Sequence, residues 1–147
     1  MNNNLREKIM HYIKKYFRRK YLFWRYNHNY KSGKPIYLNR TDRGFGFTFR
    51  VAIDSLSEYT PILVPTNITR NRVAYEICKA GQLGLGPTLT EKYAYDNLVI
   101  TPNTNLRGKK IPFILVDNSC TEKDVSNFLN NNPMIRIKNG FITKVFR

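Results

Sequence analysis

The chain has 147 residues and 41% of them are hydrophobic, which is enough for one folded domain with short appendages and excludes a wholly disordered chain. Lysine and arginine number 25 against 10 aspartate and glutamate residues, so the formal net charge is +15. Solubility needs a smaller excess than this, and a charge of this sign attracts polyanions, with nucleic acid first and anionic membranes second.

Features that identify secreted, membrane-spanning or metal-dependent proteins are missing from the sequence. It has no secretory signal and no long apolar run, and Cys78 and Cys120 are too few for a disulfide framework. We therefore expect no integral membrane segment, and a location in the cytoplasm or in a nucleoprotein assembly, an organelle or a virion included. His11 and His28 have no zinc-ligand spacing, and the acidic residues are scattered. We predict no catalytic residue, no metal and no cofactor, and hence no enzyme.

The basic residues are concentrated near the N-terminus. Residues 1–50 hold 13 of the 25 basic residues and 2 of the 10 acidic ones. Apolar residues recur at helical spacing from Leu5 to Phe17, which predicts a helix over 5–26 that begins at Asn4. Such a helix can lie on a phosphate backbone, on a membrane surface or across its own domain. Residues 1–32 are assigned as a basic helix and linker.

Four short strands are predicted in the middle of the chain. Residues 35–39 form the first, and residues 45–53, where phenylalanine and aliphatic residues alternate with others, form the clearest. Residues 61–64 lie between prolines, which favours an edge strand. Residues 95–101 complete the set. Residues 67–80 fit both a helix and a strand, because their apolar residues satisfy both periods.

The last third of the chain is predicted to form a strand, a helix and a hairpin, over residues 102–147. Residues 111–117 form an apolar strand that ends at Asp117. A short helix follows, capped by Ser119 or Thr121. Asn139-Gly140 then separates two apolar runs, and this dipeptide favours a hairpin turn.

One short motif links the basic residues to aromatic ones. Arg43-Gly44-Phe45-Gly46-Phe47 matches the start of a ribonucleoprotein motif, in which glycines clear space above a strand and aromatic rings stack on bases. Together with the spacing from Gly33 to Asn39, it makes residues 33–101 resemble a cold-shock domain. Tyr37 stands where that family has tryptophan, and Ile62-Leu63-Val64 lacks the aromatic residues of its second motif. The resemblance implies a small barrel of the OB type.

The sequence therefore predicts a β-rich α+β protein: a basic N-terminal helix, an OB-like barrel over 33–101 and a C-terminal strand–helix–hairpin unit. Its expected function is to bind single-stranded RNA or DNA without catalysis. The expected contacts are phosphate contacts from Lys14, Lys15, Arg18, Arg19, Lys20, Lys34, Arg43 and Arg50, and stacking from Tyr37, Phe45 and Phe47.

Three alternatives stay open at this point. The phenylalanines of residues 45–49 can instead form the core face of a strand, with no stacking platform. The chain can be a structural subunit of a ribosome or virion, where the barrel packs against neighbouring proteins. A small nuclease is the third possibility, although no carboxylate cluster supports it.

Overall fold

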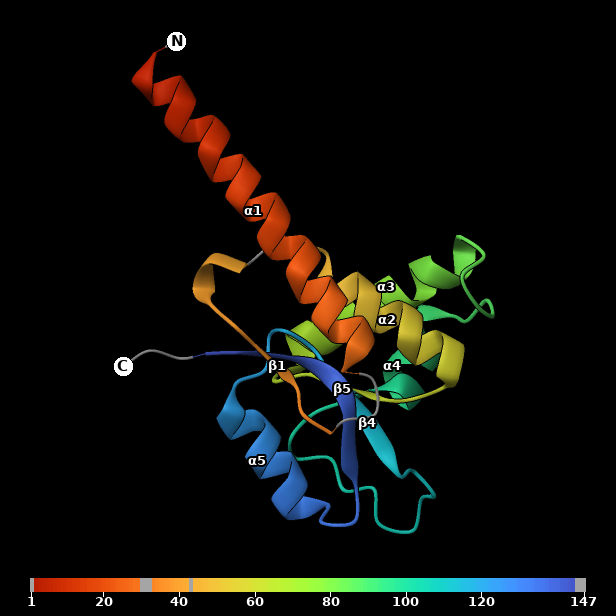
Figure 1. Cartoon of the computed structure of the whole chain (residues 1–147). Coiled ribbons are helices and arrows are strands. Elements are labelled where there is room, and N and C mark those ends of the chain that lie inside the picture. The colour runs from red at the N-terminus through yellow and green to blue at the C-terminus, as the bar shows by residue number, and fades with distance from the viewer. Residues whose placement is uncertain (1, 30–32, 43, 145–147) are drawn as a thin grey trace.

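The central feature is a five-stranded sheet in the order β1-β5-β4-β2-β3, in which every neighbouring pair is parallel. The computed structural model describes residues 2–29, 33–42 and 44–144. The strands are β1 (Ile36–Leu38), β2 (Ile62–Leu63), β3 (Val99–Ile100), β4 (Phe113–Val116) and β5 (Arg136–Thr143). Figure 1 shows β4 and β5 at the centre of the molecule.

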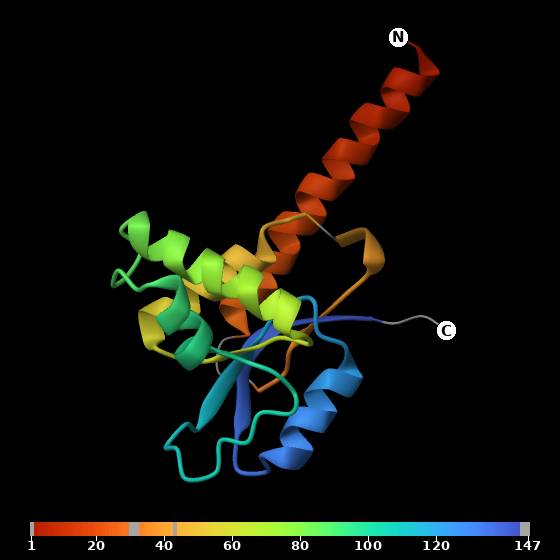
Figure 2. The same ribbon diagram turned by 180° about the vertical axis from the view of Figure 1, so that it is seen from behind.

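Helices cover both faces of this sheet. They are α1 (Asn3–His28), the short 3-10 helix η1 (Arg40–Asp42), α2 (Phe47–Glu58), α3 (Asn67–Gln82), α4 (Glu91–Leu98) and α5 (Glu122–Asn131). The C-terminal end of α1 packs on one face with α2, α3 and α4, and α5 covers the other (Figures 1 and 2). The protein is therefore an α/β sandwich of three layers.

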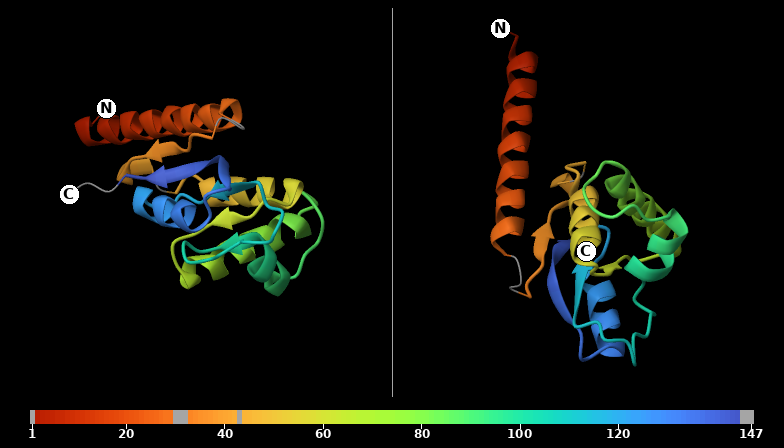
Figure 3. Two further views of the ribbon diagram at one scale, coloured as in Figure 1. Left: turned by 90° about the horizontal axis from the view of Figure 1, so that it is seen from below. Right: turned by 90° about the vertical axis from the view of Figure 1, so that its right-hand side faces the viewer.

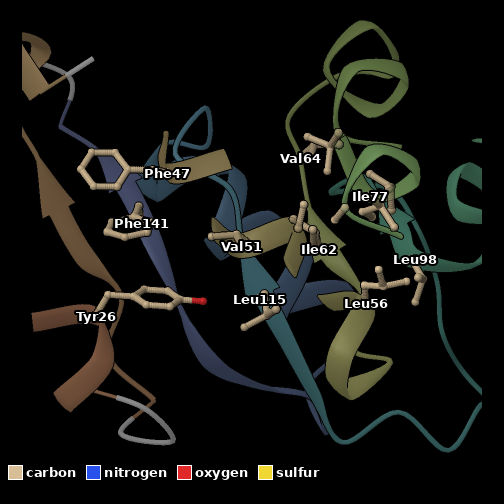
Figure 4. Packing of buried hydrophobic residues seen from close by; sticks show 14 of the residues in the cluster. Tyr26, Phe47, Val51, Leu56, Ile62, Val64, Ile77, Leu98, Leu115 and Phe141 are labelled. Carbon is tan, nitrogen blue, oxygen red and sulfur yellow. The ribbon is translucent and has the colours of Figure 1, made fainter. Parts of the chain in front are cut away.

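The strand residues alternate between two cores. In β4, Leu115 packs with Val51 of α2, whereas its neighbours Ile114 and Val116 pack with Phe128 of α5. Figure 4 shows the first of these cores, which extends from Tyr26 of α1 to α3 and α4. Since both faces are covered, the strands can be apolar throughout, as parallel strands usually are.

The predicted OB-like barrel is wrong. An OB barrel is built from antiparallel strands, whereas this sheet is open and all parallel. Residues 33–101 and 102–147 also share the sheet, because β4 and β5 insert between β1 and β2. The fold that the cold-shock resemblance implied is therefore wrong as well.

The predicted strand over residues 45–53 is helix α2. The apolar alternation there hides a helical pattern, since Phe47, Val51, Ala52, Ser55 and Leu56 are all buried and are spaced by three, four and one. Phe47 and Val51 belong both to the alternating pattern of a strand and to the spacing of a helix, so these positions do not distinguish the two structures. The ambiguous segment at 67–80 also resolves as helix, in α3.

The predicted C-terminal hairpin is one continuous strand, β5. Gly140 has φ 147°, and a Cβ atom added there would lie 2.6 Å from the backbone nitrogen of Val116. The glycine therefore permits close approach to β4 rather than a turn. Asn139 is buried and donates a hydrogen bond to the Tyr26 carbonyl at 2.8 Å.

Other predictions are confirmed or shifted. The strands near 35–39 and 111–117 are present as β1 and β4, and Thr121 caps α5 in a full capping box. The expected edge strand at 61–64 is β2, which lies between β4 and β3. Most of the strand expected at 95–101 is helix α4, and only its end forms β3.

Helix α1 is longer than predicted and extends away from the sheet. It begins after Asn2, whose side chain accepts from the Asn4 N–H at 3.0 Å, and it ends at His28, two residues after the predicted end. Its N-terminal half projects beyond the rest of the molecule in Figures 1 and 2 and in the right-hand view of Figure 3. Among the described residues, no helix has the length and apolar character that crossing a membrane requires.

Candidate phosphate-binding crevice

The candidate site lies at the edge of the sheet where the parallel strands have their carboxyl ends. The loop after β1 leads into α2 on one face, and the loop after β4 leads into α5 on the other. Ligands of open parallel α/β sheets bind at such points, because the loops diverge and leave a crevice outside the strand ends. Leu38 of β1 pairs with Thr143 of β5, so both of these strands end at this crevice.

A cavity of about 400 Å³ occupies this crevice. Its polar walls come from Asn39 after β1, from Asn118 and Ser119 after β4, and from Thr143 at the end of β5. Three exposed cations, Arg40, Arg72 and Lys144, also line it. None of the three forms an ion pair with an acidic side chain within the described part of the chain.

The one carboxylate in the cavity wall is already neutralised. Asp42 is buried, and its two oxygens accept hydrogen bonds from the Arg18 guanidinium at 3.1 and 3.2 Å. The backbone N–H of Asn39 donates a third, at 2.8 Å. The crevice therefore has an excess of positive charge, and this excess is not offset by its own acid.

The loop between β1 and α2 lines the crevice with Gly44 and leads directly into the N-terminus of α2. Gly44 and Gly46 have φ near 80°, the left-handed region that favours glycine, and no atom lies within 4 Å of a Cβ added to either. Gly46 offers no side-chain cap to α2, and the first turn of the helix contains no acidic residue. The first N–H groups of α2 therefore lack a helical acceptor and can receive an anion.

Hydrogen bonds tie the three crevice loops together. Thr48 Oγ1, in the first turn of α2, donates to Asn118 Oδ1 at 3.1 Å. Thr143 Oγ1 donates to the Asn118 carbonyl, and the Lys144 N–H donates to the Leu38 carbonyl at 2.9 Å. The cavity walls are thus fixed relative to one another before any ligand binds.

Asp117 directly precedes Asn118 of the cavity wall, and one of its carboxylate oxygens accepts no hydrogen bond from the described residues. The residue follows β4 directly and is buried, and its Oδ2 accepts from the Ser119 N–H at 3.1 Å and from the Ser119 hydroxyl. Its Oδ1 has no hydrogen-bond donor among the described residues. A buried carboxylate oxygen without a donor is costly, and a bound cation or water is one explanation for such an atom.

No protein-family model, curated protein or solved structure matches this chain. Its function therefore has to be inferred from the geometry of the site.

Two of the aromatic residues predicted to stack on bases are in the core. Phe47 is 1% exposed and its ring lies 4.4 Å from that of Phe141 and 5.1 Å from that of Phe23, centroid to centroid. Phe45 is buried against Phe47. Neither ring can reach a base, so the stacking platform is replaced by the alternative of a core face, here on a helix.

The other predicted contact residues do not form one surface. Arg18 and Arg19 bind the β1–α2 loop, at Asp42 and at the Phe45 carbonyl. Arg50 lies near Asp54 and donates to Asn27, and the Tyr37 hydroxyl donates to Glu122 at 2.9 Å. The side chains of Lys14, Lys15, Lys20 and Lys34 are exposed. Arg43 lies outside the described residues.

The crevice residues were not predicted because their role depends on the parallel sheet and on helix α2, and neither was expected from the sequence. Gly46 was assigned to a strand and Gly44 to the motif at its start, although a strand, a glycine turn and a helix form the general sequence signal of an anion site. Asp117 was noted at the end of an apolar strand and interpreted as a helix-capping or turn residue. Nothing in the sequence pointed to Arg72, which α3 contributes from a distant segment.

Proposed function

We propose that the crevice binds a phosphate ester: the phosphates of a nucleoside di- or triphosphate, or the phosphorylated end of a polynucleotide. The observation that carries this proposal is the grouping of Arg40, Arg72 and Lys144 around a cavity whose wall includes Gly44, two residues before the N-cap Gly46 of α2. Unpaired N–H groups and the helix dipole favour an anion at that point. Arginine side chains add bidentate hydrogen bonds to phosphate oxygens.

The loop departs from the general P-loop pattern in one informative position. In that pattern a lysine follows the last glycine and precedes serine or threonine, and it reaches the phosphates. Here Phe47 stands between Gly46 and Thr48, and its ring is buried. The positive charge would have to come from the crevice cations instead. We therefore propose binding, and assign no hydrolytic step to the site.

A divalent cation would fit the same arrangement. Magnesium is commonly held by one or two protein oxygens together with the phosphates of its nucleotide. Oxygen atoms near the cavity are offered by Asp117, whose Oδ1 has no donor among the described residues, and by the wall residues Asn118 and Ser119. Metal-dependent binding would distinguish a nucleotide site from a simple anion site.

The earlier expectation of nucleic-acid binding stays a prediction and is compatible with this site. A net charge of +15 raises the local concentration of any polyanion around the protein. The cavity of about 400 Å³ has the size of a site for a small ligand, so we propose that a terminal phosphate, and not a continuous strand, occupies it. Binding of a free nucleotide and binding of a phosphorylated polynucleotide end can be distinguished experimentally.

The test is a binding titration by calorimetry with four ligands: a nucleoside triphosphate, its nucleoside, a 5′-phosphorylated oligonucleotide and the same oligonucleotide without that phosphate. Each titration is run with and without magnesium. We expect the phosphorylated member of at least one pair to bind about ten-fold tighter or more than its partner. Arg72→Gln and Lys144→Gln should each remove most of that difference.

The control for these variants is Arg107→Gln, which removes an exposed arginine that does not line the cavity. It should leave the phosphate preference unchanged. Equal binding of phosphorylated and unphosphorylated ligands would contradict the proposal. Equal effects of Arg72→Gln and Arg107→Gln would reduce it to general electrostatic attraction.

A further inference from the structure

Helix α1 turns an apolar face away from the body of the protein. Its inner face is defined by Leu22 and Tyr26, which are buried against the sheet, and by Arg18, which binds Asp42. At 100° per residue, Phe17 and Trp24 lie about half a turn from that inner face. Both are largely exposed, at 64% and 56%.

This outer face is continuous along the helix. Its members are all exposed, large and apolar or aromatic, and together they are Leu5, Ile9, Met10, Tyr12, Ile13, Tyr16, Phe17, Tyr21 and Trp24. Single exposed apolar residues are normal, but a contiguous patch of this kind marks an interaction surface. The patch covers roughly half of the helix circumference, which is wider than the narrow seam of a two-stranded coiled coil.

Most of the cations of α1 lie outside this face, and only Arg6 and Lys20 lie within it. Lys14 and Arg25 lie on one flank, and Lys20 lies within the patch with its Nζ 5.2 Å from the centre of the Tyr16 ring. Arg18 and Arg19 point inward, to Asp42 and to the Phe45 carbonyl. A helix that ran along a phosphate backbone would need most of its cations outward, whereas six of the eight cations of α1 lie off its outer face, so this pattern disfavours nucleic acid as the occupant.

We propose that α1 lies on an anionic membrane surface, with its outer apolar face among the lipid chains and its lysine and arginine side chains at the headgroups. Interfacial helices have this composition: aromatic and aliphatic residues on one face, and basic residues on the other. Tyrosine and tryptophan favour the headgroup level, and long basic side chains extend to it from an apolar face. Basic residues beside anionic lipid supply charge complementarity.

The orientation of the body fits this placement. The sheet and its other helices lie on the inner side of α1, opposite the apolar face, and the N-terminal half of α1 extends past them (Figures 1 and 3). The helix can therefore lie flat in the interface while the crevice stays in water. This inference does not rest on the proposed ligand of the crevice.

The test uses the full chain and its single tryptophan, Trp24, as the reporter. Vesicles of phosphatidylcholine alone are compared with vesicles of equal parts phosphatidylcholine and phosphatidylglycerol, at low and high salt. We expect co-flotation with the anionic vesicles, a blue shift of Trp24 emission on binding, and weaker binding at high salt. Ile13→Ser with Phe17→Ser should weaken binding about ten-fold or more.

The matched control is Ile68→Ser with Met134→Ser, which removes two exposed apolar side chains outside α1. It should bind vesicles as the unaltered chain does, and urea titration should show both double variants folded. The inference is overturned if neither vesicle binds, or if the α1 variant binds as well as the control. It is also overturned if Trp24 emission is already blue-shifted without lipid in a dimer of the chain, or if the α1 variant loses nucleic-acid binding instead.

Discussion

Arg18 of α1 and Asp42 of η1 form a two-point contact, with Nε to Oδ1 at 3.1 Å and Nη2 to Oδ2 at 3.2 Å. It joins the long helix to the loop that leads into α2 and the crevice. Asp42 is 3% exposed whereas Arg18 is partly exposed, so the carboxylate depends on this partner more than the guanidinium does. Deletion of the arginine would leave a buried charge with one backbone donor.

We expect Arg18→Ala to lower the free energy of unfolding by about 2 kcal/mol, because it leaves the Asp42 carboxylate poorly compensated. Urea denaturation followed by circular dichroism measures this. Lys14→Ala removes an exposed cation from the same helix and should change stability by less than about 0.5 kcal/mol. Equal losses in the two variants would show that the contact with Asp42 has no particular importance.

Phe47 should behave as a core residue and not as a nucleic-acid contact. We expect Phe47→Ala to cost about 3–5 kcal/mol, since it empties space between Phe23, Phe45 and Phe141. Phe113→Ala, at a partly exposed position, should cost about 1 kcal/mol or less. Thermal unfolding compares the two. A well-folded Phe47→Ala protein that had lost only single-strand binding would contradict the packing described here.

Individual elements, though not the fold class, could be predicted where local signals and tertiary packing agree. The helix over 5–26, the strands at 35–39 and 111–117 and the Thr121 cap all follow from residues close in sequence. The sheet direction could not be predicted in this way. Parallel strands pair with strands that are distant in the sequence. The position of β5 between β1 and β4 depends on such pairings, and no local pattern indicates them.

The candidate site could not be predicted because two local patterns were ambiguous. Apolar residues between 45 and 53 satisfy both the strand and the helix period, and the buried set at 47, 51, 52, 55 and 56 shows that the sheet contact selects the helix. Asn139-Gly140 favours a turn in isolation. The close approach of Val116 decides for a strand, and this contact is invisible in the sequence.

Gly140 provides a sharp test of that strand. Gly140→Ala would place a Cβ 2.5 Å from the Val116 carbonyl oxygen at φ 147°, so we expect a loss of about 3 kcal/mol or more. Gly108→Ala is the control, because Gly108 also has positive φ but no atom lies within 4 Å of its added Cβ. Its cost should be about 1 kcal/mol, from the backbone alone. Similar losses in both variants would argue against the close β4–β5 contact at this point.

The two thiols should differ in reactivity. Cys120 is fully buried, its Sγ lies 3.2 Å from the Leu63 carbonyl oxygen, and burial raises the pKa of its thiol well above the usual range. Because the thiolate is the reactive form, a raised pKa slows reaction at neutral pH. Cys78 is partly exposed. A disulfide reagent should titrate one thiol in the native protein and the second only after unfolding, and Cys78→Ser should abolish the fast phase.

The central claim is that the cavity at the carboxyl ends of β1, β4 and β5 receives the phosphates of a ligand. Hydrogen exchange with mass spectrometry tests it most directly, in the presence and absence of a nucleoside triphosphate with magnesium or a 5′-phosphorylated oligonucleotide. The account predicts slower exchange at residues 44–49 and 118–121 with one of these ligands, and no change in the Arg72→Gln variant. Protection confined to other segments, or no protection with either ligand, would contradict it.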